Sequence, residues 1–179
     1  MDLSSPAGFR DISLCGTGAT SRVYRAVEIS SGRILALKRL HRQLVRDGRA
    51  LARLRRELAS LRRIRHVGIV AALDIIEWQG DPTIVMEYVP GEDLKERILR
   101  EGRLTCVESE RIAGALFDVL AVTHASGIVH RDVKPQNVRL GEDGRVYLLD
   151  FGSARSGSAK TDASTCSTSA RPGWTRRRS

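Results

Sequence analysis

The chain has 179 residues, a length that fits a single globular domain. Hydrophobic residues make up 41% and charged residues 28%, which excludes collagen-like, mucin-like and broadly disordered chains. The net charge of +9 raises the question of a nucleic-acid partner, but residues 153–179, with six basic residues and one acidic, carry +5 of it. The remainder lacks a recognition motif with interleaved aromatic residues, so we do not expect nucleic acid as a partner.

The sequence carries no targeting or membrane signal. No run approaches the ~18 uncharged apolar residues that a membrane-spanning helix needs, and residues 1–6 lack a basic stretch leading into an apolar run. Cys15, Cys106 and Cys166 have neither zinc-ligand nor disulfide-framework spacing. We therefore expect a cytoplasmic protein with no membrane segment, and the oligomeric state stays open.

The first half of the chain is predicted to be mostly β-structure with one helix. Turn-forming residues separate the apolar β-type runs, at 30–33 and at 79–82. Residues 46–65 predict the helix, because leucines recur on one 3.6-residue stripe and arginines fill the other faces. The predicted strands are residues 23–27 and 34–40, within a first β-rich stretch that covers 9–40, and residues 69–76 and 83–89 after the helix.

The second half is predicted to be helical and then to return to short strands. Residues 90–93 break the pattern before the first helix, and residues 153–179 hold eleven Ser or Thr without apolar periodicity, which predicts a disordered tail. The order of elements is typical of an α+β fold. The predicted helices are residues 94–100 and 107–125, and the predicted short strands are 128–129, 138–140 and 146–149, with a turn at 141–144.

A glycine-rich turn and a lysine are the first residues that could carry chemistry. Gly16 and Gly18 lie between two predicted strands, where backbone N–H groups could approach a phosphate without a side chain in the way. Taken alone, these glycines are better explained by a plain hairpin turn. Lys38 shares a strand face with Ile34 and Ala36, which indicates an ammonium held near an anion; the alternative is a lysine that reaches solvent from a strand end.

Glu57 is the third candidate. It is the only acidic residue between Asp47 and Asp74, in an arginine-rich predicted helix, and a partly buried Lys38 needs a counter-ion that Glu57 could supply. The alternative is a surface pair with Arg53 along the same helix.

The strongest candidate is the polar run over residues 130–137, His-Arg-Asp-Val-Lys-Pro-Gln-Asn. Pro135 prevents a helix, so these side chains belong to a loop between short strands. Asp132 can orient a hydroxyl and take its proton, Lys134 can stabilise a transferring phosphoryl group, and Asn137 can coordinate a metal. Residues 150–152, Asp-Phe-Gly, follow an apolar strand and place a second metal-holding acid, Asp150, after one hairpin.

Taken in this order, the five elements resemble the protein kinase family of the serine/threonine type, and residues 129–137 resemble its bacterial members. The resemblance covers about residues 9–152. It implies a protein-kinase-like α+β fold, with a β-rich, ATP-binding N-lobe and one main helix over residues 9–89 and an incomplete helical C-lobe with the catalytic loop over 90–152. Residues 153–179 form the predicted tail.

The resemblance also implies the ligands ATP and Mg²⁺ and a role for each catalytic residue. Gly16 and Gly18 would cover the phosphates, and Lys38, paired with Glu57, would hold two of them. Asp132 would be the catalytic base. The pattern with Lys134 is that of serine/threonine kinases, and the metal ligands would be Asn137 and Asp150.

The implied base pocket adds a second group of residues. Residues 85–89 resemble the hinge that bonds adenine through its backbone, at Glu87 and Val89, with Met86 as the gatekeeper. Asp93 would contact the ribose. Val23 and Ala36 would pack on the adenine ring.

Three departures separate this chain from the family pattern. Ser21 replaces the third glycine of the turn, and Arg139 stands where an apolar residue normally lies under the adenine ring. The chain also ends 27 residues after Gly152 without an Ala-Pro-Glu motif, so we expect a kinase domain truncated after Asp-Phe-Gly. The helix around Leu116, Val119 and Leu120 would then lose part of its covering and leave an apolar patch. A frameshift in the tail is one explanation of the loss.

The predicted function is the transfer of the ATP γ-phosphoryl group to Ser or Thr of a protein substrate, impaired by the truncation. The alternative is a catalytically inactive, ATP-binding kinase remnant or interaction module.

Overall fold

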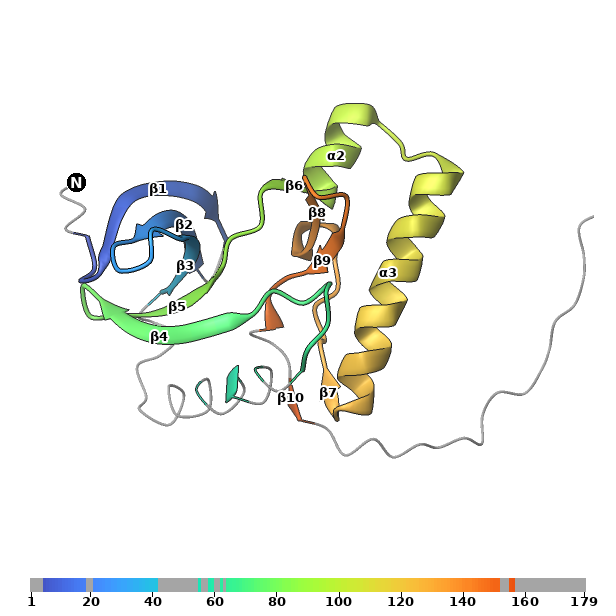
Figure 1. Cartoon of the computed structure of the whole chain (residues 1–179). Helices are drawn as coiled ribbons and strands as arrows, with labels where there is room; N and C mark the ends of the chain where they lie inside the picture. Colours follow the sequence, from blue (N-terminus) through green and yellow to red (C-terminus); the bar gives the residue numbers. More distant parts are fainter. Residues whose placement is uncertain are drawn as a thin grey trace, which may run out of the picture.

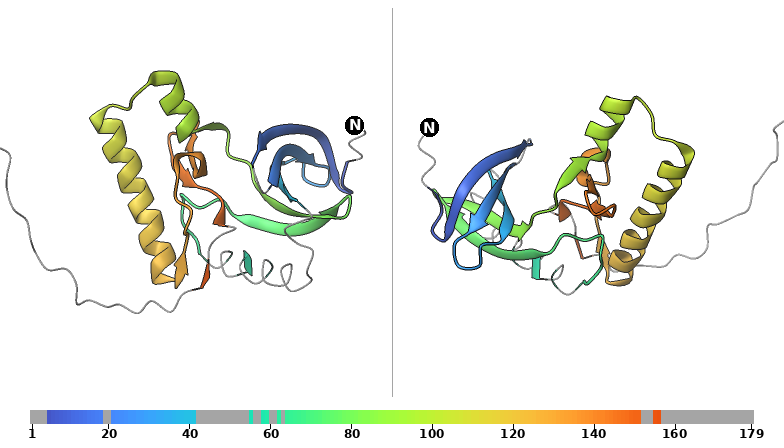
Figure 2. Two further views of the ribbon diagram at one scale, coloured as in Figure 1. Left: turned by 180° about the vertical axis from the view of Figure 1, so that it is seen from behind. Right: turned by 45° about the horizontal axis from the view of Figure 1, so that its top comes forward.

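The computed structural model shows an antiparallel sheet at one end of the molecule, two helices at the other, and a small sheet between them (Figure 1). The turned views in Figure 2 show the same separation from behind and from above. This arrangement confirms the predicted α+β class. The structure describes residues 5–18, 21–41, 55, 58–59, 62, 64–151 and 155–156.

The large sheet has five antiparallel strands in the order β1-β2-β3-β5-β4. The predicted four-residue turn at 79–82 is shorter in the structure: Gln79 and Gly80 have φ values of 55° and 78°, and strand pairing resumes at Asp81. A two-residue turn with both residues left-handed matches the twist of a hairpin. The strands are β1 (Phe9–Thr17), β2 (Ser21–Glu28), β3 (Ile34–Leu40), β4 (Ala72–Trp78) and β5 (Asp81–Glu87).

The two faces of this sheet differ in what they carry. One face closes a core around Trp78, whose ring meets Tyr24 edge-on at 4.8 Å between centroids. Because side chains alternate along a strand, Ala36 and Lys38 point to the opposite face, across from Met86 and Ile84 respectively. This second face is the one that carries the candidate site. The core residues of the first face are Phe9, Tyr24, Ala26, Leu35, Leu37, Trp78 and Val85.

Both described helices begin with reciprocal caps. Helix α2 (Leu94–Glu101) starts after Asp93, and α3 (Cys106–Ala125) starts after Thr105. In each case the cap side chain accepts from the backbone N–H three residues on, and a glutamate there accepts from the cap backbone. The helices therefore begin one residue from their predicted starts or closer.

The small central sheet has the order β6-β8-β9 and corrects the interpretation of residues 90–93. That stretch holds β6 (Gly91–Asp93), a three-residue strand too short to show alternation. β8 (Val138–Gly141) and β9 (Val146–Leu148) form the predicted hairpin, and the 3-10 turn η2 (Pro135–Asn137) precedes it.

A second two-stranded sheet enters the stretch predicted to be a disordered tail. β10 (Arg155–Ser156) pairs with β7 (Ile128–Val129), so pairing continues past residue 153. Unlike its apolar partner β7, the Arg-Ser pair of β10 has no apolar β-type signal of its own, and its partner supplies the hydrogen bonds. Residues 157–179 lie outside the described residues. Of the predicted helix over 46–65, only residues 55, 58–59, 62 and 64–65 are described, and the first three of these are helical.

The second core packs the helices against the central sheet, and it corrects one expectation. Val119 is buried, and Leu116 and Leu120 are half-buried against this core, so the helix is covered at these positions. The exposed apolar side chains on α3 are instead Val107, 75% exposed, and Phe117, 70% exposed. No helix in the described part of the chain is both long and apolar enough to cross a bilayer.

Candidate active site

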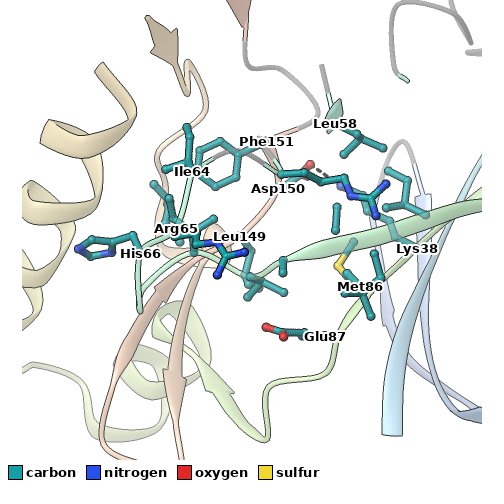
Figure 3. Close-up of a pocket in the computed structure, with 18 of the residues that line it drawn as sticks. Lys38, Leu58, Ile64, Arg65, His66, Met86, Glu87, Leu149, Asp150 and Phe151 are labelled. Atoms are coloured by element: carbon teal, nitrogen blue, oxygen red, sulfur yellow. Dashed lines mark hydrogen bonds and ion pairs between the residues drawn. The ribbon is translucent and has the colours of Figure 1, made fainter. Parts of the chain in front are cut away.

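Lys38 and Asp150 meet in the space between the large sheet and the central sheet. Lys38 is buried on β3, and its Nζ forms an ion pair with Oδ1 of Asp150, which follows β9 (Figure 3). The two residues stand 112 positions apart in the sequence. A buried ammonium needs such a partner, because an unpaired charge in this environment is strongly destabilised.

The predicted partner of Lys38 was Glu57. Glu57 lies outside the described residues, so its pairing with Lys38 stays a prediction. The structure adds Asp150 as a partner that the sequence analysis had assigned to a metal alone.

His130 ties the catalytic loop to the segment that bears Asp150. Its ring is buried, and its Nδ1 accepts a hydrogen bond from the backbone N–H of Asp132 at 3.3 Å. The proton of the neutral ring is therefore on Nε2, which donates to the carbonyl oxygen of Leu149 at 2.8 Å. The ring also meets Phe151 edge-on at 4.6 Å. This bridge was missed by the sequence reasoning, because its acceptor is a backbone carbonyl.

Asp132, Lys134 and Asn137 form one hydrogen-bonded cluster. Oδ2 of Asp132 accepts from Nζ of Lys134 at 2.7 Å and from Nδ2 of Asn137 at 3.0 Å. Nδ2 of Asn137 also donates to the Asp132 carbonyl oxygen at 2.8 Å. The bond from Lys134, and after it the bond from Asn137, holds the pKa of Asp132 below its ordinary value. These hydrogen bonds keep the carboxylate ionised and fix its orientation.

Two residues of the site have left-handed backbones without being glycine. Arg131 has φ 68° and Asp150 has φ 61°. This region is sparsely populated for such residues, and the surrounding structure must hold them there. Both flank the groups that could do chemistry, and the His130 bridge and the Lys38 ion pair are the contacts that maintain the geometry.

Gly16 of the glycine-rich turn lies in register with residues of the same sheet face. Gly16 pairs with Val23 across β1 and β2, and Val23 in turn pairs with Lys38. Neither Gly16 nor Gly18 has a positive φ, and a Cβ added to them would meet its nearest neighbour at 3.8 Å and 3.7 Å. These are ordinary contacts, so the described fold does not itself require glycine at either position.

The hinge residues connect the two ends of the molecule. β5 ends at Glu87, whose backbone N–H donates to the Ala71 carbonyl at 3.1 Å, and Met86 lies opposite Ala36. Val89 accepts a hydrogen bond from Nε of Arg139 at 3.0 Å, a contact that the sequence analysis missed. Asp93, assigned by resemblance to the ribose, is the N-cap of α2 in the structure.

A cavity of about 640 Å³ lies behind the Lys38–Asp150 pair (Figure 3). Met86, Ile84 and Phe151 are among its apolar walls, and Glu87 stands at its hinge end. Gly16, Val23, Asp132 and Asn137 do not line it. The cavity therefore borders the Lys38–Asp150 pair but not the Asp132 cluster. It is not the space beneath the glycine-rich turn.

The donor set on this surface suits a hard cation. Mg²⁺ prefers oxygen ligands and is usually held by one or two carboxylates together with water and phosphate oxygens. Asp150 offers a carboxylate and Asn137 an amide oxygen, and the backbone N–H of Leu149 donates to the Asn137 carbonyl at 2.7 Å, which brings the two segments together. Across the described residues, no group of three or more His, Cys, Asp and Glu is placed to hold a metal alone.

Comparison with known proteins identifies the family to which this chain belongs. The sequence model of the protein kinase domain matches residues 9–172. The chain belongs to the protein kinase family. The match extends past Gly152, beyond the range that the motifs indicate by themselves.

The relatives are of the serine/threonine type, and several are bacterial. A probable serine/threonine-protein kinase PknB of Corynebacterium glutamicum is 38% identical over 154 residues, covering 84% of this chain and 24% of its own. A probable serine/threonine-protein kinase of Streptomyces coelicolor is 43% identical over 145 residues, covering 78% of this chain and 21% of its own. One from Bifidobacterium longum is 34% identical over 160 residues, 88% of this chain and 21% of its own. The kinase chain thus spans about a quarter or less of the length of these relatives.

Proposed function

We propose that this kinase chain binds ATP and transfers its γ-phosphoryl group to a Ser or Thr hydroxyl of a protein substrate. The observation that carries the proposal is the convergence of two units: the Lys38–Asp150 ion pair and the Asp132 cluster, linked through His130 and Leu149. Phosphoryl transfer needs little covalent chemistry from a protein, so positioning and charge stabilisation are the functions to look for. Both units supply them.

The phosphates are proposed to lie between the glycine-rich turn and Lys38. Gly16 and Gly18 leave the backbone accessible although the described fold does not demand glycine there, which supports close approach by a ligand. Lys38 carries a buried positive charge on the same sheet face as Val23 and Ala36. Those two side chains are proposed to pack on the base, with the backbone of Glu87 and Val89 beside it.

The chemical step is proposed to centre on Asp132. The substrate hydroxyl oxygen forms the new bond to the γ-phosphorus as the bond to the leaving ADP oxygen breaks, and Asp132 accepts the hydroxyl proton. Lys134, bonded to Asp132, places positive charge next to the transferring group. Asn137 and Asp150 are the residues that would hold Mg²⁺, which when bound neutralises phosphate charge.

The test is transfer of radiolabelled phosphate from ATP by the purified chain, with magnesium and a generic basic protein as acceptor. Asp132→Asn keeps the shape of the side chain but removes the base, and we expect it to lower the rate at least ~100-fold. Transfer that persists in this variant would contradict the assigned step. Absence of transfer by both, with a thermal-shift response to ATP and magnesium, would indicate a nucleotide-binding module without turnover.

A further inference from the structure

Arg139 is a charged side chain of the central sheet that the proposed chemistry does not use. It lies on β8, between Asp93 of β6 and Tyr147 of β9. Its neighbours Val138 and Leu140 are buried in the helical core, so the alternation of the strand turns Arg139 away from that core and toward the hinge. Its Nε donates to the Val89 carbonyl oxygen at 3.0 Å.

The charge of Arg139 also acts on a residue of the large sheet, Cys15. Cys15 lies on β1, beside the glycine-rich turn, and its Sγ donates to the carbonyl oxygen of Val23 at 3.4 Å. Burial raises the pKa of the Cys15 thiol, and the positive charge of Arg139 acts in the opposite direction. The side chain of Arg139 thus runs from β8 to the Val89 carbonyl oxygen at the hinge.

We propose that Arg139 determines base affinity in this site, because its guanidinium, bonded to the Val89 carbonyl oxygen, occupies part of the space beside the hinge that a purine would otherwise use. The inference rests on the proposed function, because it takes Val23, Ala36 and the hinge as the walls of the base pocket. A purine base that enters the pocket must displace the guanidinium from the Val89 carbonyl oxygen. The free energy of the lost charge-assisted hydrogen bond then reduces the binding free energy of the base. The phosphate part of a nucleotide does not meet this obstacle.

The two parts of the nucleotide provide a test with separate probes. Adenosine reports on the base pocket, and inorganic tripolyphosphate with magnesium reports on the phosphate site; both dissociation constants are measured by calorimetry on the full chain. We expect Arg139→Leu to bind adenosine about tenfold more tightly, which corresponds to ~1.4 kcal/mol. Tripolyphosphate binding stays within about twofold of the unsubstituted chain.

Three further variants control the experiment. Arg145→Leu removes an exposed arginine from the β8–β9 turn, paired with Asp143 at 3.8 Å, and leaves adenosine binding unchanged. Arg139→Lys keeps the charge but not the planar donor, and gives an intermediate affinity. Arg139→Met, unbranched and closer to arginine in shape, replaces Arg139→Leu if thermal unfolding shows that the leucine variant does not fold.

Each remaining outcome overturns the inference. Unchanged adenosine binding in Arg139→Leu would mean that the side chain lies outside the base pocket, and weaker binding would mean that it supports the base from below. Failure of every variant to bind adenosine would also refute it. Phosphotransfer from ATP is measured separately. If the chain transfers phosphate but substitution of Arg139 does not change adenosine binding, this inference alone is wrong. If both nucleotide binding and transfer are absent, the proposed function is wrong as well.

Discussion

The carboxylate of Asp132 is held from two sides by residues two and five positions further along the chain. Lys134 and Asn137 both bond Oδ2, and Asn137 is buried, so the cluster is fixed at one end and open at the other. A base for proton abstraction must be ionised before the hydroxyl arrives. The lowered pKa of Asp132 ensures this at neutral and mildly acidic pH.

Lys134→Met therefore changes the pH dependence of transfer as well as its rate. Without the ammonium, the pKa of Asp132 rises toward the ordinary aspartate value, because the largest cause of its lowering is gone. The base form exists above the pKa, so the acidic limb of the rate profile moves to higher pH. Rates measured at saturating ATP across the acidic range check this prediction. An acidic limb that stays in place would mean that Lys134 does not control the ionisation of Asp132.

Short elements at the centre of the molecule depend on close backbone approach. Gly91 of β6 has φ 134°, and a Cβ there would stand 2.0 Å from the Leu140 carbonyl oxygen on β8. Both the backbone angle and the contact exclude any other residue without movement. β6 can form because its first residue is a glycine; no apolar pattern marks the strand in the sequence. The strand joins the hinge to α2.

Gly91→Ala is expected to lower the free energy of unfolding by at least ~2 kcal/mol, through backbone strain and displacement of β8. Gly114→Ala on α3 is the matched control: nothing lies within 4 Å of its added Cβ, and the exposed helix gains ~0.5–1 kcal/mol from alanine. Urea unfolding midpoints of the two variants should move in opposite directions. A neutral Gly91→Ala would show that β6 can be rebuilt without strain.

At the scale of the whole molecule, the helical end presents apolar side chains to solvent. Phe117 and Val107 lie largely exposed on α3, and Leu99 is 73% exposed on α2. The sheet end also exposes apolar side chains, Leu14, Ile29 and Ile34, but its large aromatic residues are enclosed in the core around Trp78. Large exposed apolar groups lower solubility and attract other surfaces.

Phe117→Ser is expected to reduce binding of an apolar fluorescent dye and concentration-dependent self-association, while it changes the free energy of unfolding by less than ~1 kcal/mol. Val119 lies two positions away and is buried, and Val119→Ala is expected to lower the free energy of unfolding by ~2 kcal/mol without reducing dye binding. Light scattering and dye titration check both. Dye binding that does not change in Phe117→Ser would place the accessible apolar surface elsewhere.

The sequence allowed the elements to be predicted where their signals are local. Helices α2 and α3 start directly after their N-cap residues, Asp93 and Thr105. The predicted strand pairs are present because turn residues flank each apolar run. Strands β6 and β10 were missed for one shared reason. Each is a short polar stretch without an apolar run, and its hydrogen bonds come from a distant partner, Leu140 or Val129, that no local window of sequence contains.

The candidate site divides in the same way. The residue types and their order, from the glycine-rich turn to Asp150, were determined by the sequence alone, because each motif is a short run whose chemistry is present in the run itself. Tertiary structure alone decided which of these groups touch. Lys38 pairs with Asp150 across 112 positions and Arg139 bonds Val89 across 50, and such contacts depend on how the sheet and the helical end fold against each other.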